Sequence, residues 1–188
     1  MHIKKHLSFS ALRKMLSKRF LQVEDTRQGD VKYRLHDFFM TGFAMMYFQD
    51  PSLLSFQRRL QIAYNQNNLE TMFDIESIPK DSQLREVLDK ASTEELESLF
   101  PDFLQQLQRG NHLNSYQFLD GRYLIPIDGS GYFSSKKICC SGCLQKKNKK
   151  TGEIRYNHQI LQAAIVHPDM KQVLPLAPES IKNTDGSK

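Results

Sequence analysis

The chain has 188 residues, a net charge of +5 and 39% hydrophobic residues, and its three cysteines all lie within residues 139–143. An odd, clustered set of cysteines argues against a secreted disulfide framework, and no apolar segment of signal-peptide type follows the N-terminal Met-His-Ile-Lys-Lys. The most apolar stretch, residues 38–48, is about half of the ~20 residues that a helical membrane crossing needs, so we expect a cytoplasmic protein without a membrane partner.

Residues 8–110 carry a helical pattern. Apolar residues recur at helix spacing from Leu12 to Phe20, and Asp37 and Asp81 are placed to cap two further helices. Residues 92–95, Ser-Thr-Glu-Glu, have the pattern of a capping box, and Gly110 ends the helical run. We therefore expect residues 1–110 to form an all-helical module with a role in DNA binding or assembly.

Beyond Asn111 the hydrophobic period changes to that of strands. Asp120-Gly121 is a two-residue turn between strand-forming segments, which predicts a β-hairpin. A second hairpin is expected around Thr151-Gly152, with its strands at 137–144 and 153–158. The expected fold class is α+β, a helical module followed by antiparallel strands.

One carboxylate, Asp128, closes the short apolar run 122–127 and precedes Gly129. An acid at the exit of a buried strand is held rigidly by the sheet and still faces solvent, which suits it to bind a divalent cation. The alternative is an ordinary turn aspartate before glycine.

Basic residues gather at two places in the chain. Residues 1–23 contain six Lys or Arg and no acid, and a second cluster follows Asp128. Neutralising phosphates releases counterions, so such clusters are candidate DNA-binding sites, although they also occur as solvated helix faces and hairpin tips. The candidate DNA-binding residues are Arg13, Lys14, Lys18, Arg19, Lys136, Lys137, Lys146 and Lys147.

The cysteine cluster is a candidate zinc site. Cys140 and Cys143 have the spacing that lets two thiolates bind one ion, and His158 lies across the expected hairpin as a third ligand. For a fourth ligand, Cys139 would face the opposite side of a strand, which leaves His167. The alternative is a pair of buried or half-buried thiols at a strand end.

Taken together, these segments resemble one family, the DDE-type insertion-sequence transposases. Residues 124–130, 138–143 and 156–158 are similar to the family's segment around its first catalytic aspartate. Residues 81–89 resemble the helix upstream of that aspartate, and 165–169 with 175–179 resemble the stretch downstream. The resemblance therefore spans nearly the whole chain.

The resemblance implies an RNase H-like core in which two aspartates and a glutamate bind two Mg²⁺ (or Mn²⁺) ions and cleave and join DNA strands. Only the first carboxylate can be placed, at Asp128, which the family would make catalytic and a Mg²⁺ ligand. The later acids stand in no matching context: Glu153, Asp169, Glu179 and Asp185.

We therefore expect the N-terminal part of a truncated DDE transposase, with residues 111–188 as a partial RNase H-like core. Its substrate would be transposon-end DNA in a prokaryotic cytoplasm, at the nucleoid. The family's sheet also predicts that the strand bearing Asp128 is central and takes one neighbour from sequence after Lys188. The alternative is a catalytically inactive DNA-binding or regulatory product that binds DNA, itself or the full-length transposase.

Overall fold

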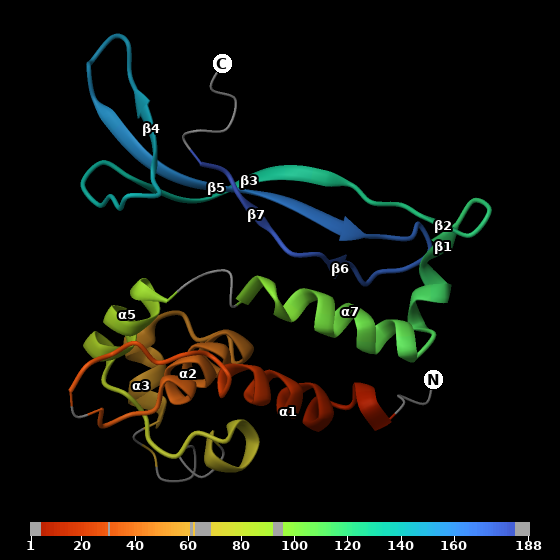
Figure 1. Ribbon diagram of the computed structural model, residues 1–188. Coiled ribbons are helices and arrows are strands. Elements are labelled where there is room, and N and C mark those ends of the chain that lie inside the picture. Colours follow the sequence, from red (N-terminus) through yellow and green to blue (C-terminus); the bar gives the residue numbers. More distant parts are fainter. Residues whose placement is uncertain (1–4, 30, 61, 63–68, 92–95, 183–188) are drawn as a thin grey trace. The chain divides into compact units, whose positions relative to one another are not determined.

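The computed structural model describes residues 5–29, 31–60, 62, 69–91 and 96–182. The chain divides into two compact units, Met1–Leu99 and Phe100–Lys188, which are described separately below (Figure 1). The capping box expected at residues 92–95 and the acid Asp185 lie outside the described residues. Among the helices of the described residues, none has the length and apolar character that a membrane crossing requires.

The first unit is helical. Its elements are η1 (Lys5–Leu7), α1 (Phe9–Phe20), α2 (Leu35–Tyr47), α3 (Leu53–Leu60), a helical segment at 69–73 and α5 (Asp81–Lys90). Ser8 caps α1, because its Oγ accepts a hydrogen bond from the Ala11 N–H at 3.2 Å. Aromatic rings from several helices form the core: Phe20 stacks on Phe39 with 4.8 Å between centroids, and Phe38, Phe56 and Phe73 are fully buried.

The two caps expected at aspartates are wrong, by three residues at Asp37 and by one residue at Asp81. Arg34 is the N-cap of α2 and Lys80 is the N-cap of α5, and neither makes a side-chain capping bond. Asp37 and Asp81 instead lie in the first turns of these helices. A carboxylate there still favours the helix, because the helix dipole is positive at its N-terminus.

The second unit combines a helix with antiparallel strands, which confirms the α+β class. Its elements are α7 (Leu99–Arg109), which begins at the boundary, η2 (His112–Tyr116), β1 (Gln117–Phe118), β2 (Arg122–Tyr123), β3 (Ile127–Ser135), β4 (Leu144–Lys147), β5 (Ile154–Ile165), β6 (Leu174–Pro175) and β7 (Glu179–Ser180). Leu104 and Leu107 of α7 pack against a small core formed by Leu113, Tyr116 and Ile165. The sequence pattern placed this helix with the preceding helices, but its apolar residues pack against the strands of the second unit.

Both expected hairpins form, with differences in detail. In the first, Phe118 pairs with Arg122, so the loop contains Leu119, Asp120 and Gly121 and is one residue longer than expected. All three loop residues have positive φ. In the second, β4 pairs with β5 from Leu144 to Lys147, and residues 138–143 are turn and loop where strand was expected.

The long strand β5 organises the main sheet (Figure 1). Along one side it pairs with β3 from Ile127 to Ser135. Along its other side it pairs in turn with β4, β7 and β6, all antiparallel. Among the described strands β3 pairs only with β5, so the strand that carries Asp128 lies at an edge of the sheet.

Candidate metal centre and basic hairpin

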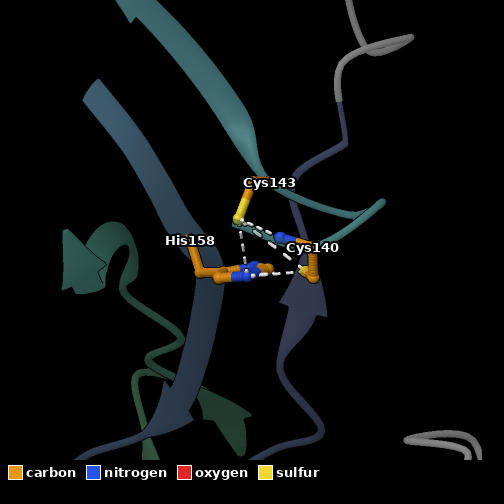
Figure 2. Close-up of side chains that lie close together, drawn as sticks. All are labelled: Cys140, Cys143 and His158. Carbon is orange, nitrogen blue, oxygen red and sulfur yellow. Dashed lines mark hydrogen bonds between the residues drawn. The ribbon is translucent and has the colours of Figure 1, made fainter. Parts of the chain in front are cut away.

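Cys140, Cys143 and His158 lie together beside β5, with their side chains directed at one another (Figure 2). The two sulfurs are 3.7 Å apart, and the His158 Nε2 is 3.2 Å from the Cys140 Sγ and 3.3 Å from the Cys143 Sγ. Within the described parts of the chain, this is the one group of His, Cys, Asp or Glu side chains whose ligand atoms gather closely enough to hold a metal ion. The three residues singled out by spacing are therefore neighbours in space.

A tight turn brings the two cysteines together. Ser141 and Gly142, residue types that favour turns, separate them, and the Cys143 N–H donates to the Cys140 carbonyl at 3.2 Å. The Cys140 N–H in turn donates to the Cys143 Sγ at 3.2 Å. Because this segment is not a strand, the expectation that Cys139 faces the opposite side of a strand does not apply.

The third ligand candidate, His158, is held by aromatic rings from β3. Its imidazole stacks on Tyr132 at 5.7 Å between centroids and lies at 5.5 Å from Phe133. A register shift between Gly131 and Phe133 leaves Tyr132 as the extra residue of a β-bulge. The bulge lets two adjacent rings contact one histidine. This contact was not expected from the sequence, where the only signal for it is the aromatic pair Tyr132-Phe133 after Gly129 and Gly131.

Burial and neighbouring thiols affect the chemistry of Cys143, which is 3% exposed, whereas Cys139 and Cys140 are exposed. The hydrogen bond from the Cys140 backbone N–H lowers the pKa of the Cys143 thiol, but desolvation and the thiols of Cys140 and Cys139 outweigh it and raise that pKa overall. A bound cation would reverse this balance, because it favours the thiolate directly.

Asp128 occupies a different position from the one expected. It is the second residue of β3, and the neighbouring Ile125 and Ile127 are 48% and 63% exposed, so it does not stand at the exit of a buried strand. An apolar run becomes buried only where another element covers it, and these residues remain uncovered. The Asp128 Oδ1 accepts a hydrogen bond from the Gly129 N–H at 2.8 Å.

No other described carboxylate gathers with Asp128 into a group able to hold a cation. Asp128 pairs with Gln162 of β5, and Glu179 of β7 pairs with the adjacent Leu161. Side chains of adjacent strand residues point to opposite faces, so Asp128 and Glu179 lie on opposite faces of the sheet. The geometry leaves Asp128 as a single exposed acid.

The N-terminal basic residues divide by exposure. Lys14, Lys18 and Arg19 are exposed on α1. Arg13 is buried, and its guanidinium forms an ion pair with Asp74. Arg13 therefore serves the packing of the first unit, and its charge is not presented at the surface.

The basic cluster after Asp128 is exposed on the β4–β5 hairpin and its approach. Residues 136–155 contain seven Lys or Arg and one acid, Glu153, whose carboxylate pairs with Lys136 at 2.7 Å. Lys146 pairs directly with Arg155 across the hairpin, which places two positive side chains on one face. Asp128 pairs with Gln162, which lies seven residues beyond Arg155 along β5, a distance of roughly 20 Å. Lys146 and Arg155 therefore lie far from Asp128.

A buried cluster of polar side chains, Ser17, His36 and Asp37, lies inside the first unit and was not expected from the sequence. The Ser17 Oγ is 2.9 Å from the His36 Nε2, and the His36 Nδ1 is 3.2 Å from the Asp37 Oδ1. This Ser-His-Asp order resembles a nucleophilic triad, but the three residues are 6%, 4% and 1% exposed. A substrate cannot reach a hydroxyl buried in this way, so the group joins α1 to α2 as a structural network.

Comparison with models of protein families gives no match, and comparisons with curated proteins and with solved structures give none either. Inference about function therefore rests on the chain's own residues and geometry. These are a three-residue candidate metal centre, an exposed basic hairpin beside it and one exposed aspartate on an edge strand.

Proposed function

We propose that this protein acts in DNA transposition as a DNA-binding member of the DDE transposase class, with the β4–β5 hairpin as its DNA-contacting element. The observation that carries the proposal is the exposed hairpin, with seven basic residues against one acid in residues 136–155. Figure 1 shows it projecting from one end of the sheet. Phosphate contacts from such an element supply salt-dependent affinity.

The antiparallel pairing of β3 with β5 is compatible with the family assignment, although β3 lies at an edge of the sheet and not at its centre as expected. In the RNase H-like fold, the strand that bears the first carboxylate has a neighbour on each side. Here β3 carries Asp128 and pairs along one side with β5. In the family, a further strand pairs along its other side, and we propose that residues 111–188 represent part of that fold.

The proposal assigns DNA binding, and not strand cleavage, to this chain. A two-metal mechanism needs several carboxylates to hold two ions against the attacking and leaving oxygens. Mg²⁺ bound through a single carboxylate is held weakly, because it keeps most of its waters. Among the described residues, Asp128 belongs to no group of three or more ligand side chains that could hold a metal ion. The alternative, a chain that cleaves DNA, requires such a group.

The test of DNA binding is a fluorescence titration of labelled duplex DNA at several salt concentrations. We expect the protein to bind the duplex. The logarithm of the binding constant should fall linearly as the logarithm of the salt concentration rises. The variant Lys146→Gln/Lys147→Gln should reduce that slope by about one to two and weaken binding roughly tenfold at low salt. The matched control is Lys80→Gln/Lys171→Gln, which removes the same charge from exposed positions outside the hairpin.

Absence of DNA binding by the unaltered protein would overturn the proposal. Equal weakening by the hairpin variant and by the control would overturn the assignment to the hairpin while leaving DNA binding in place. Unchanged binding by Lys146→Gln/Lys147→Gln together with a loss on changing Lys14 and Lys18 would move the contact to α1.

A further inference from the structure

We infer that Cys140, Cys143 and His158 bind one Zn²⁺ ion, which joins the turn before β4 to the central strand β5. The inference stands independently of DNA binding, because it rests on the geometry and chemistry of three side chains. It would apply to this sheet whatever the protein contacts.

The distances within the group fit one face of a tetrahedral zinc site. With Zn–S bonds of about 2.3 Å and Zn–N bonds of about 2.0 Å, two sulfurs lie about 3.8 Å apart, and a sulfur and a nitrogen about 3.5 Å apart. The observed separations are 3.7 Å between the sulfurs and 3.2 and 3.3 Å from the sulfurs to Nε2. A tetrahedral ion therefore needs adjustments of only about 0.3 Å.

The ligand types select the metal. Two thiolates and an imidazole suit Zn²⁺, whereas Mg²⁺ and Ca²⁺ take oxygen ligands. The surrounding contacts also suit a metal site, since the Cys140 N–H donates to the Cys143 Sγ at 3.2 Å. Tyr132 and Phe133 hold the His158 ring with Nε2 facing the sulfurs.

The position of the site explains what the ion does. Between residues 117 and 164, all of which the structure describes, Cys143 is the only buried residue. This half of the sheet therefore has no apolar core to hold the hairpin against β3. A structural metal can supply the stability that a small core cannot. Zinc at this point would fix the base of the hairpin whose strands carry Lys146, Lys147 and Arg155.

The three gathered side chains leave the fourth ligand of a tetrahedral ion to be assigned. His167, the fourth ligand considered from sequence, follows the far end of β5 and packs against Phe118, so it is not available. The exposed Cys140 leaves room for water or for the thiolate of the adjacent Cys139. A Cys139→Ser variant separates these two sources.

The experiment measures zinc directly on the full chain, purified under reducing conditions. Zn²⁺ is titrated into the metal-free protein in competition with a chromophoric chelator, and the bound metal is quantified. We expect about one Zn²⁺ per chain, because the three side chains form a single site. Cys140→Ser, Cys143→Ser and His158→Ala should each weaken Zn²⁺ binding by about a hundredfold or more, whereas Cys139→Ser should retain the stoichiometry.

A second measurement does not depend on variants that fold poorly. Co²⁺ replaces Zn²⁺ in the unaltered protein, and its visible spectrum reports tetrahedral geometry and thiolate ligation. A spectrum with thiolate charge-transfer bands supports the inference, and its loss of intensity in Cys139→Ser would assign the fourth ligand to Cys139. Failure of the reduced, unaltered protein to bind stoichiometric Zn²⁺, or an octahedral Co²⁺ spectrum without thiolate bands, would overturn the inference.

Discussion

At the scale of single residues, Asp128 shows how exposure limits what a side chain contributes to folding. It lies on an edge strand, and its carboxylate accepts one hydrogen bond from the next backbone N–H. Nothing buried depends on its charge. A catalytic role would need other carboxylates gathered with it, and the described residues form no such group of three or more around Asp128.

We therefore expect Asp128→Asn to change the free energy of unfolding by less than about 0.5 kcal/mol, because an exposed side chain with one local bond adds little. Thermal unfolding measures this, and plasmid nicking with Mg²⁺ or Mn²⁺ measures catalysis in the same preparations. The matched control is Asp169→Asn, whose side chain is 92% exposed. Metal-dependent nicking by the unaltered protein that survives in the control and is lost in Asp128→Asn would favour the catalytic alternative.

At the scale of elements, Arg27 orders the connection between α1 and α2. Its Nε and Nη2 donate to the Asp25 carboxylate at 2.7 and 2.5 Å, and Nη2 also donates to the Tyr33 carbonyl at 2.9 Å. Its guanidinium lies 4.9 Å from the centroid of the buried Phe38 ring. The Arg27 side chain thus connects the loop between α1 and α2 to the core of the first unit.

The Asp25–Arg27 pair makes part of this stability dependent on pH. The hydrogen bonds from the Arg27 side chain are the main cause that lowers the pKa of Asp25, against an opposing effect of burial. A carboxyl with a lowered pKa stabilises the fold above its unfolded pKa, and that contribution is lost as pH falls through its folded pKa. The loss therefore occurs below the ordinary aspartate value of 3.8.

We expect Arg27→Met to lower the free energy of unfolding near neutral pH, by less than about 1 kcal/mol from the ion pair, since the Asp25 side chain is 33% exposed. The difference in free energy of unfolding between Arg27→Met and the unaltered protein should become smaller at acidic pH. Urea unfolding at about pH 7 and about pH 3 measures it. The control is Arg58→Met, at an exposed position of α3. If the free energy of unfolding of Arg27→Met differs from that of the unaltered protein by the same amount at both pH values, the Asp25–Arg27 pair does not cause the pH dependence.

At the scale of the whole molecule, the second unit has an exposed edge and a small core. Ile127 and Tyr132 on β3 are each 63% exposed, and the free side of β3 carries unpaired backbone groups among the described residues. Such edges are templates for pairing with another chain. The core beside β5 is completed by Leu104 and Leu107 of α7.

A fragment of residues 111–188 lacks α7, so we expect it to be poorly soluble or oligomeric. Light scattering after size exclusion measures its mass, and the fragment 100–188, which keeps most of α7, is the comparison. Ile127→Lys in either fragment should reduce association, because an edge charge opposes strand pairing. A monodisperse monomer of 111–188 that melts cooperatively would contradict this expectation.

Local sequence features were sufficient to predict much of this architecture. Asp120-Gly121 and Thr151-Gly152 lie in the turns of two hairpins, and the change of period after Asn111 marks the change from helix to strand. The spacing of Cys140 and Cys143, with His158 across the hairpin, was also enough to select the three members of the candidate metal centre. These predictions succeed because turns and short ligand spacings depend on residues within one hairpin.

Only the tertiary structure decided where these elements meet. It placed α7 with the strands, put Asp128 near the start of an edge strand, separated it from Glu179 by the sheet, and buried Arg13 against Asp74. It also brought Tyr132 and Phe133 onto His158 through a bulge. Periodicity shows which face of an element is apolar, but the choice of its partner depends on contacts between residues far apart in the chain.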